Sequence, residues 1–190
     1  MKNHVNEALA PDTSCTCCAD LLAAKFDRRR FLIATAGGLA AAALVPSLAF
    51  AKYGKFEAML LSCIDPRFQK PVYKYMDGRK LSGKYSSFVI AGAAIGVVAP
   101  AFKDWHKAFW DNLDASIQLH SIDKVIVIDH RDCGAARIAY GDASIADAET
   151  ETRTHREVLA EFRKQLKERF PKLEAETGLM ALNGKLEKLG

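Results

Sequence analysis

The chain has 190 residues, of which 49% are hydrophobic and 26% are charged, and its formal net charge is +4. This balance is typical of a globular protein and provides enough apolar residues for one domain with a sizeable core. The charges are spread along the chain and form no basic stripe with interleaved aromatic residues, which argues against a nucleic-acid partner.

The first fifty residues have the three parts of a secretory signal. Arg28-Arg29-Arg30 is a charged region, residues 33–48 are an uncharged run rich in Ala and Gly, and Ala49-Phe50-Ala51 is a small-x-small cleavage site. The paired arginines, followed by x-Phe-Leu, resemble the twin-arginine export signal. We therefore expect residues 1–51 to be removed during export to the periplasm through the twin-arginine machinery, which leaves a domain over 52–190.

An uncleaved membrane anchor is the alternative, because the apolar run is long enough to span a bilayer. Pro46 and the cleavage site favour removal, so no stable membrane anchor is expected. Cleavage after Ala51 would also remove the N-terminal cysteines and leave Cys63 and Cys133. Two cysteines in an exported protein suggest a disulfide, but the His, Asp and Arg residues close to them favour a metal site.

The region after the signal predicts strands that alternate with helices. Apolar runs predict strands at 56–62, 87–90, 125–128 and 178–186. Apolar spacing and turn signals predict helices at 70–76, 102–117 and 158–170, with a short one from Gly134. Residues 143–154 are mostly polar and unpatterned, which predicts a loop. The alternation indicates an α/β fold, a single domain with a mostly parallel central sheet flanked by helices.

Two of these strands end in residues that bind metals. Cys63 directly follows the first strand, and His130 and Cys133 follow the strand at 125–128. If the two strands are parallel, the three side chains converge at the C-terminal ends of the strands, where open α/β sheets bind ligands. Two thiolates and an imidazole are a zinc set that leaves one coordination position open.

Each residue also has a purely structural interpretation. Cys63 and Cys133 would then be buried, inert thiols, and His130 would be a core histidine bonded to a carbonyl group. Asp65-Pro66-Arg67 would be a turn with a surface ion pair of little energetic value. The presence of all of them at strand ends, in this order, favours the metal site.

Cys63-x-Asp65-x-Arg67, followed by His130-x-x-Cys133, resembles the pattern of the beta-class carbonic anhydrases, and the similarity extends over most of the chain after the signal. The resemblance implies one zinc ion per chain, held by Cys63, His130 and Cys133, with Asp65 and Arg67 as a catalytic dyad beside it. The implied activity is the reversible hydration of carbon dioxide to bicarbonate by a zinc-bound hydroxide. The implied assembly is a homodimer or a multiple of dimers.

The resemblance also implies a role for each member of the dyad. Asp65 would accept the hydroxide proton in a hydrogen bond and so direct an oxygen lone pair at the substrate. Arg67 would hold Asp65 through a charge-assisted pair and keep it off the metal. The family further implies a resting form in which the aspartate itself occupies the fourth position on zinc.

Some positions depart from the family pattern. Asp129 stands where a Gly usually precedes the metal-binding His, which puts an extra acid close to the zinc ligands. The Ala91-Gly92 segment lacks the flanking Arg-Asn and Asn that the family commonly shows. Asp132 lies between two ligands, either as a partner that orients them or as a solvated loop acid. His155, like the other remaining histidines, is expected to be a structural or surface residue.

These departures leave two alternative functions open. One is a catalytically weak or inactive zinc-binding homologue, and the other is a hydrolase of a related heterocumulene such as COS or CS2. A cysteine phosphatase is disfavoured because Cys133-x-x-x-Arg137 is shorter than the Cys-x5-Arg loop of those enzymes. A dithiol redox protein is disfavoured because the chain after the signal has no CxxC motif.

Overall fold

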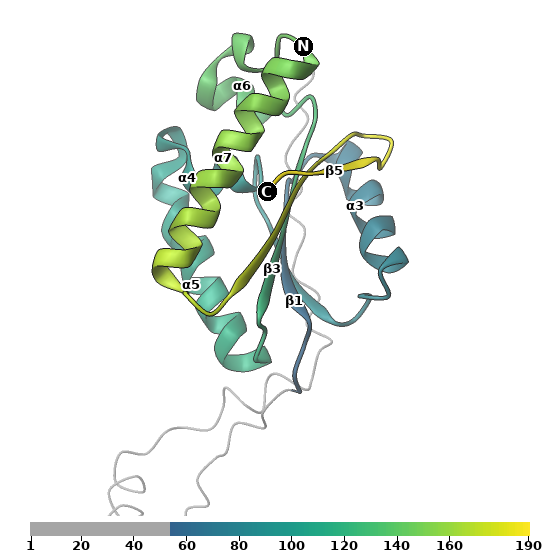
Figure 1. Ribbon diagram of the computed structural model, residues 1–190, viewed down its shortest axis with the longest axis vertical. Coiled ribbons are helices and arrows are strands. Elements are labelled where there is room, and N and C mark those ends of the chain that lie inside the picture. The colour runs from purple at the N-terminus through teal and green to yellow at the C-terminus, as the bar shows by residue number, and fades with distance from the viewer. Residues whose placement is uncertain (1–53) are drawn as a thin grey trace, which may run out of the picture. The chain divides into compact units, whose positions relative to one another are not determined.

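A five-stranded sheet forms the centre of the protein, with the strand order β2-β1-β3-β4-β5 (Figure 1). The computed structural model describes residues 54–190, so the expected export signal and its cleavage site lie outside the described residues. The first four strands pair in parallel and the fifth is antiparallel to the fourth. The strands are β1 (Ala58–Ser62), β2 (Tyr85–Val89), β3 (Lys124–His130), β4 (Glu174–Met180) and β5 (Leu186–Lys188).

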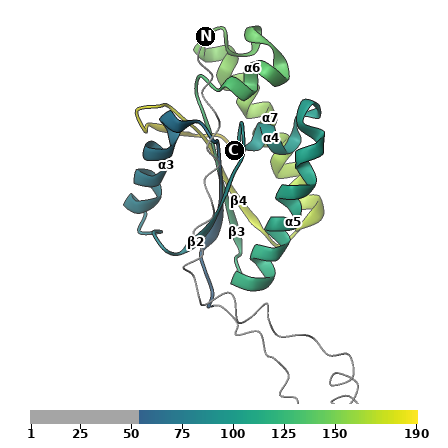
Figure 2. The ribbon, with the colours of Figure 1, turned by 180° about the vertical axis from the view of Figure 1, so that it is seen from behind.

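Helices cover both faces of this sheet. On one face lies α3, and on the other lie α4, α5 and α7 (Figures 1 and 2). Their bounds are α3 (Pro66–Gly78), α4 (Ala94–Val98), α5 (Lys103–His120), α6 (Gly134–Tyr140) and α7 (Ala148–Arg169), with 3-10 turns at Pro100–Phe102 and Asp142–Ile145. The prediction of a single α/β domain with a mostly parallel central sheet is confirmed. Among residues 54–190, no helix combines the length and the apolar character needed to cross a membrane.

The two central strands are buried on both faces. All five residues of β1 are buried, and so is every residue of β3 after Lys124. Strands covered on both sides show continuous apolar runs and not an alternation, which is the pattern that the sequence shows here.

The order of the strands reverses between β1 and β3. The chain leaves β1 through α3 to reach β2, and it returns from β2 through α5 to β3 on the other side of β1. It then leaves β3 through α6 and α7 toward β4, so the connections that follow the neighbouring strands β1 and β3 run in opposite directions, with α3 and α7 on opposite faces (Figure 2). Ligands of open α/β sheets bind at such a reversal of strand order.

The expected loop over 143–154 is wrong, because α7 begins at Ala148. Asp147 caps this helix, and its Oδ1 accepts hydrogen bonds from the backbone N–H groups of Glu149 (2.9 Å) and Thr150 (2.8 Å). The inward-facing residues of the first turns include Glu151 and His155, which are buried although polar. Buried polar residues leave no hydrophobic period, so the sequence pattern does not reveal these turns.

Two other predicted bounds also differ from the structure. The helix expected at 70–76 begins earlier, because Asp65 caps it and Pro66 occupies its first position. The single strand expected at 178–186 is a hairpin, in which β4 ends at Met180 and the chain turns back through Gly184 at a φ of 92°. The apolar run continues across that turn, which explains why it reads as one strand.

Candidate metal centre

The structure brings together the three side chains that the sequence predicts as metal ligands. Cys63 follows β1, His130 ends β3 and Cys133 is the residue before α6. One potential ligand atom from each residue lies within 4.8 Å of the others, and all three residues are buried. The group therefore lies at the C-terminal ends of the two central strands, as expected.

The His130 ring is oriented with one nitrogen free toward this group. Its Nδ1 lies 2.8 Å from the carbonyl oxygen of Arg131, so Nδ1 carries the proton and donates to that carbonyl. Nε2 is buried and has no hydrogen-bond partner among the described residues. The ring also stacks on Phe68, with the ring centroids 4.8 Å apart. A buried, unprotonated Nε2 without a donor is what a metal-binding histidine presents.

The two cysteines are free thiols and form no disulfide with each other. A hydrogen bond from Cys133 lowers the pKa of Cys63 to about 4, against the opposing effect of burial. The backbone N–H of Gly92 also donates to Cys63 Sγ, at 3.2 Å. The same bond to Cys63, together with burial, raises the pKa of Cys133. Cys63 thus forms a thiolate readily, and the two sulfurs share one proton. A divalent cation in place of that proton would stabilise both thiolates, so the donor set fits zinc.

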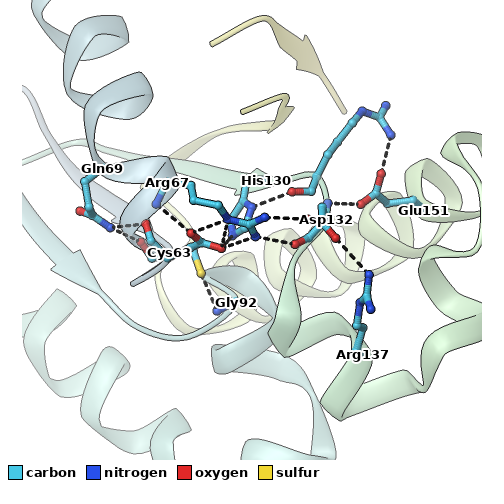
Figure 3. A network of polar contacts seen from close by, with 10 residues as sticks. Cys63, Arg67, Gln69, Gly92, His130, Asp132, Arg137 and Glu151 are labelled. Carbon is cyan, nitrogen blue, oxygen red and sulfur yellow. Dashed lines mark hydrogen bonds and ion pairs between the residues drawn. The ribbon is translucent and has the colours of Figure 1, made fainter. Parts of the chain in front are cut away.

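Asp65 and Arg67 form a bidentate ion pair beside this group (Figure 3). Arg67 Nε donates to Asp65 Oδ1 at 3.0 Å and Nη2 donates to Oδ2 at 2.6 Å. These hydrogen bonds lower the pKa of Asp65 to about 2, so its carboxyl group is ionised at neutral pH. Asp65 Oδ2 lies 3.9 Å from His130 Nε2. The structure thus places an ionised carboxylate next to the potential ligand atoms, with both of its oxygens held by one guanidinium.

Asp132 holds the other side of the same arginine. Its Oδ2 accepts from Arg67 Nη1 at 2.7 Å, and its Oδ1 accepts from Arg137 Nη2 at 3.1 Å (Figure 3). Asp132 is thus a half-exposed partner of Arg67 and Arg137, and neither of these bonds goes to one of the three potential metal ligands. Arg67 is therefore fixed from both sides, although about half of its side chain is exposed.

Two buried residues of α7 support the site and were missed by the sequence analysis. Glu151 accepts a hydrogen bond from the backbone N–H of Asp132 at 2.5 Å, and its other oxygen accepts from Arg131 Nη1 at 3.0 Å (Figure 3). His155, one turn later, has its Nδ1 2.8 Å from Asp129 Oδ2. The two residues are four positions apart and so share one face of a helix. That spacing is the signal that could have indicated them.

Asp129 does not act as a free acid beside the potential ligands. Its Oδ2 is engaged by His155, and its Oδ1 accepts a hydrogen bond from the backbone N–H of Ala94 at 3.0 Å. Both oxygens are thus occupied by groups from α4 and α7. The extra acid expected close to the zinc ligands is part of the packing between these helices and β3.

Gly92 is required at its position on conformational and steric grounds. Its φ is +78°, and a Cβ placed there would lie 2.8 Å from the Cβ of Ala135. We expect Gly92→Ala to lower the free energy of unfolding by more than about 2 kcal/mol, because it adds a left-handed backbone penalty to a clash. Urea denaturation measures this loss. Gly134→Ala is the control, since a Cβ there meets nothing within 4 Å; equal midpoints for the two variants would contradict the prediction.

Comparisons with known proteins identify a family and two relatives. A family model described as "Putative carbonic anhydrase" matches residues 53–174. An uncharacterized protein of Rickettsia bellii is 33% identical over 131 residues, which cover 69% of this chain and 80% of the relative. One of Rickettsia conorii is 31% identical and covers 69% and 70%.

A solved structure shares the fold. It is one of two tetrameric beta-carbonic anhydrases from the filamentous ascomycete Sordaria macrospora. It aligns with a TM-score of 0.51 at 12% identity, and the alignment covers 85% of this chain and 93% of that one. At this identity the likeness shows the fold alone.

Proposed function

The chain belongs to the beta-carbonic-anhydrase-like family, and from this membership we propose that it is a zinc enzyme that reversibly hydrates carbon dioxide to bicarbonate. The observation that carries the proposal is the ionised Asp65, held by Arg67, 3.9 Å from the unpartnered Nε2 of His130. A turn with a surface ion pair would have no need to lie against a buried, unpartnered imidazole and two buried thiols.

The proposed metal site consists of Cys63, His130 and Cys133, with one zinc ion per chain. Zinc held there supplies a Lewis acid that lowers the pKa of a coordinated water to about 7. The protein contributes three buried ligand side chains, a histidine tautomer fixed by the Arg131 carbonyl, and a backbone donor from Gly92 to one thiolate.

Asp65 and Arg67 are the proposed catalytic residues. Because Asp65 remains ionised, it can only accept hydrogen bonds, so it selects the orientation in which the nucleophile donates to it. Arg67 holds both carboxylate oxygens, and Asp132 holds Arg67 in turn, which keeps the acceptor in one place. Such fixed positioning of a reacting group lowers the barrier without a change in the chemistry.

Metal content and turnover of the purified chain test this function. We expect about one zinc ion per chain and a CO2 hydration rate that falls on chelation and returns when zinc is added. Zinc-loaded protein that does not hydrate CO2 would indicate the inactive homologue. Turnover of COS or CS2 in place of CO2, followed by product analysis, would indicate the heterocumulene hydrolase. Protein that binds no zinc under any condition would contradict all three functions.

The assembly is proposed to be a homodimer or a multiple of dimers. The structure from Sordaria macrospora described above is of tetrameric enzymes, which supports an oligomer for a chain of the same fold. Light scattering during size-exclusion chromatography measures the mass of the assembly directly. A mass of one chain, 20.9 kDa or less after cleavage, would contradict it.

Export to the periplasm is proposed from the N-terminal pattern. We expect a double variant, Arg28→Lys with Arg29→Lys, to retain the precursor in the cytoplasm, because the twin-arginine machinery reads the arginine pair. Cell fractionation and mass spectrometry of the N-terminus measure the outcome, with Arg30→Lys as a control outside the pair. An unchanged periplasmic yield of a form that begins near Lys52 would contradict the proposal.

A further inference from the structure

A fully buried acid–imidazole pair lies directly behind the candidate metal centre. Asp129 Oδ2 and His155 Nδ1 are 2.8 Å apart, and the side chains of both residues are completely buried. His155 Nε2 has no partner among the described residues. A buried carboxylate without hydrogen bonds is strongly destabilising, so both oxygens of Asp129 require hydrogen-bond donors inside the protein.

Asp129 is connected to the metal centre through a single tight turn. Its Oδ1 accepts from the backbone N–H of Ala94, two residues after Gly92, and the N–H of Gly92 donates to Cys63 Sγ at 3.2 Å. A continuous path of short contacts thus runs from His155 on α7, through Asp129 on β3 and the turn before α4, to a potential metal ligand.

The turn at 92–94 is strained and is held both by its own backbone hydrogen bonds, Ala93 N–H to Ile90 and Ile95 N–H to Gly92, and by Asp129. Both Gly92 and Ala93 have positive φ angles, +78° and +48°. For an alanine, which carries a Cβ, a φ of +48° with a ψ of −110° is a strained backbone conformation. Ala93 provides no side-chain cap for α4, so the N–H of Ala94 depends on the carboxylate of Asp129. The hydrogen bond is charge-assisted and therefore among the stronger ones available to a backbone N–H.

We propose that Asp129 and His155 are positioning residues for Cys63, which hold the 92–94 turn so that the N–H of Gly92 points at the sulfur. His155 donates to one oxygen of Asp129 and thereby directs the other oxygen at Ala94. The inference rests on the proposed function, since it gives Cys63 the role of a metal ligand. Residues that orient a metal ligand typically contribute 10–100-fold to metal affinity.

The test compares zinc affinity, measured by competition with a chelator, in four variants of the full chain. Asp129→Ala removes both acceptors, and His155→Leu removes the donor to Asp129. Asp129→Asn can still accept from Ala94 and can donate to His155 if the imidazole proton moves to Nε2. Leu166→Ala is the stability control, because Leu166 is buried on the same helix, about three turns further along than His155.

We expect Asp129→Ala to weaken zinc binding about 10–100-fold and His155→Leu about 10-fold. Asp129→Asn should recover most of the loss. In cobalt-substituted protein, Asp129→Ala should shift the thiolate-to-metal charge-transfer band, and hydrogen exchange should show faster exchange at the Gly92 and Ala94 amides. Leu166→Ala should lose thermal stability while its zinc affinity and cobalt spectrum stay as in the wild type.

The inference is overturned if Asp129→Ala binds zinc as tightly as Leu166→Ala, or if Asp129→Asn is no better than Asp129→Ala. Should Asp129→Ala fail to fold, His155→Leu decides by the same criteria, and wild-type affinity in that variant overturns the inference. A wild-type protein that binds zinc without hydrating CO2 contradicts the proposed function only. If the wild type hydrates CO2 and neither Asp129→Ala nor His155→Leu changes the zinc affinity, only the positioning role is contradicted.

Discussion

Replacement of Cys133 by serine is expected to remove most of the zinc and to lower the thermal stability markedly. Cys133 is 1% exposed, and its sulfur lies within 4.8 Å of the potential ligand atoms of Cys63 and His130. A serine hydroxyl has nearly the same shape but is not deprotonated by zinc at neutral pH, so one anionic ligand is lost. We expect the loss of affinity to exceed the roughly 10–100-fold that is typical of residues that only orient a ligand.

Stability should fall with affinity, because the binding energy of an ordered site adds to the free energy of folding. Elemental analysis gives the zinc content, and calorimetry with and without added zinc gives the coupled stability. Ala136→Ser is a suitable control, since it introduces a hydroxyl at a buried position of α6 that offers no ligand atom. The zinc assignment is wrong if Cys133→Ser retains one ion per chain, or if native protein contains a Cys63–Cys133 disulfide and no metal.

The second large effect is expected for Arg67→Ala, which should abolish most of the activity and leave the zinc in place. A guanidinium is no metal ligand, so the metal content should stay near that of the wild type. Without the Arg67 guanidinium, Asp65 Oδ2 loses its donor and Oδ1 keeps only the backbone N–H of residue 67, so Oδ2 is free to compete with water for the metal. The pKa of Asp65 should rise from about 2 toward its ordinary value of about 4.

This shift leaves the charge of Asp65 unchanged at neutral pH. A carboxyl group whose pKa is lowered in the folded state stabilises that state above its ordinary pKa, and the contribution is lost as the pH falls toward 2. At pH 7 Asp65 is ionised with or without Arg67. The loss of activity in Arg67→Ala therefore reports the position of the carboxylate and not its ionisation.

Asp65→Asn removes the carboxylate that accepts a hydrogen bond from the nucleophile and leaves the three proposed zinc ligands in place. An amide can donate as well as accept, so it no longer selects the orientation of the nucleophile. We expect turnover to fall on the order of 10²-fold, as for a lost positioning group, with zinc content unchanged. For the Arg67→Ala variant, Arg79→Ala is the matched control, because Arg79 makes an equivalent bidentate pair with Glu176 at the far end of α3.

Crystal structures of the zinc-loaded wild type and of Arg67→Ala give the structural readout for these variants. They distinguish a water ligand from a carboxylate ligand, and Arg67→Ala should replace the water by Asp65. If wild type and Arg67→Ala show the same ligands and hydrate CO2 equally well, Asp65-Pro66-Arg67 is only a helix start with an ion pair. The catalytic assignment would then be wrong while the metal assignment stands.

The fold class and the residues of the candidate centre could be predicted from the sequence because both depend on local patterns. The apolar runs 58–61 and 125–128 make up most of β1 and β3, as expected for strands buried on both faces. Parallel strands bring their C-terminal ends to one edge, so side chains that follow two such strands must lie close together. Asp65 and Arg67 are two residues apart, and their pairing is equally local.

The contacts that support the centre were decided only by the tertiary structure. Asp132 meets Arg67 across 65 positions of the chain, and Asp129 meets His155 across 26. Glu151 and His155 lie in turns that the sequence pattern assigns to a loop or leaves unassigned, because a buried polar face has no hydrophobic period. Which groups satisfy such a face depends on how α4 and α7 pack against β3. Hydrophobic periodicity predicts which side chains are buried. It does not predict their hydrogen-bond partners, because these lie on elements that are distant in the sequence.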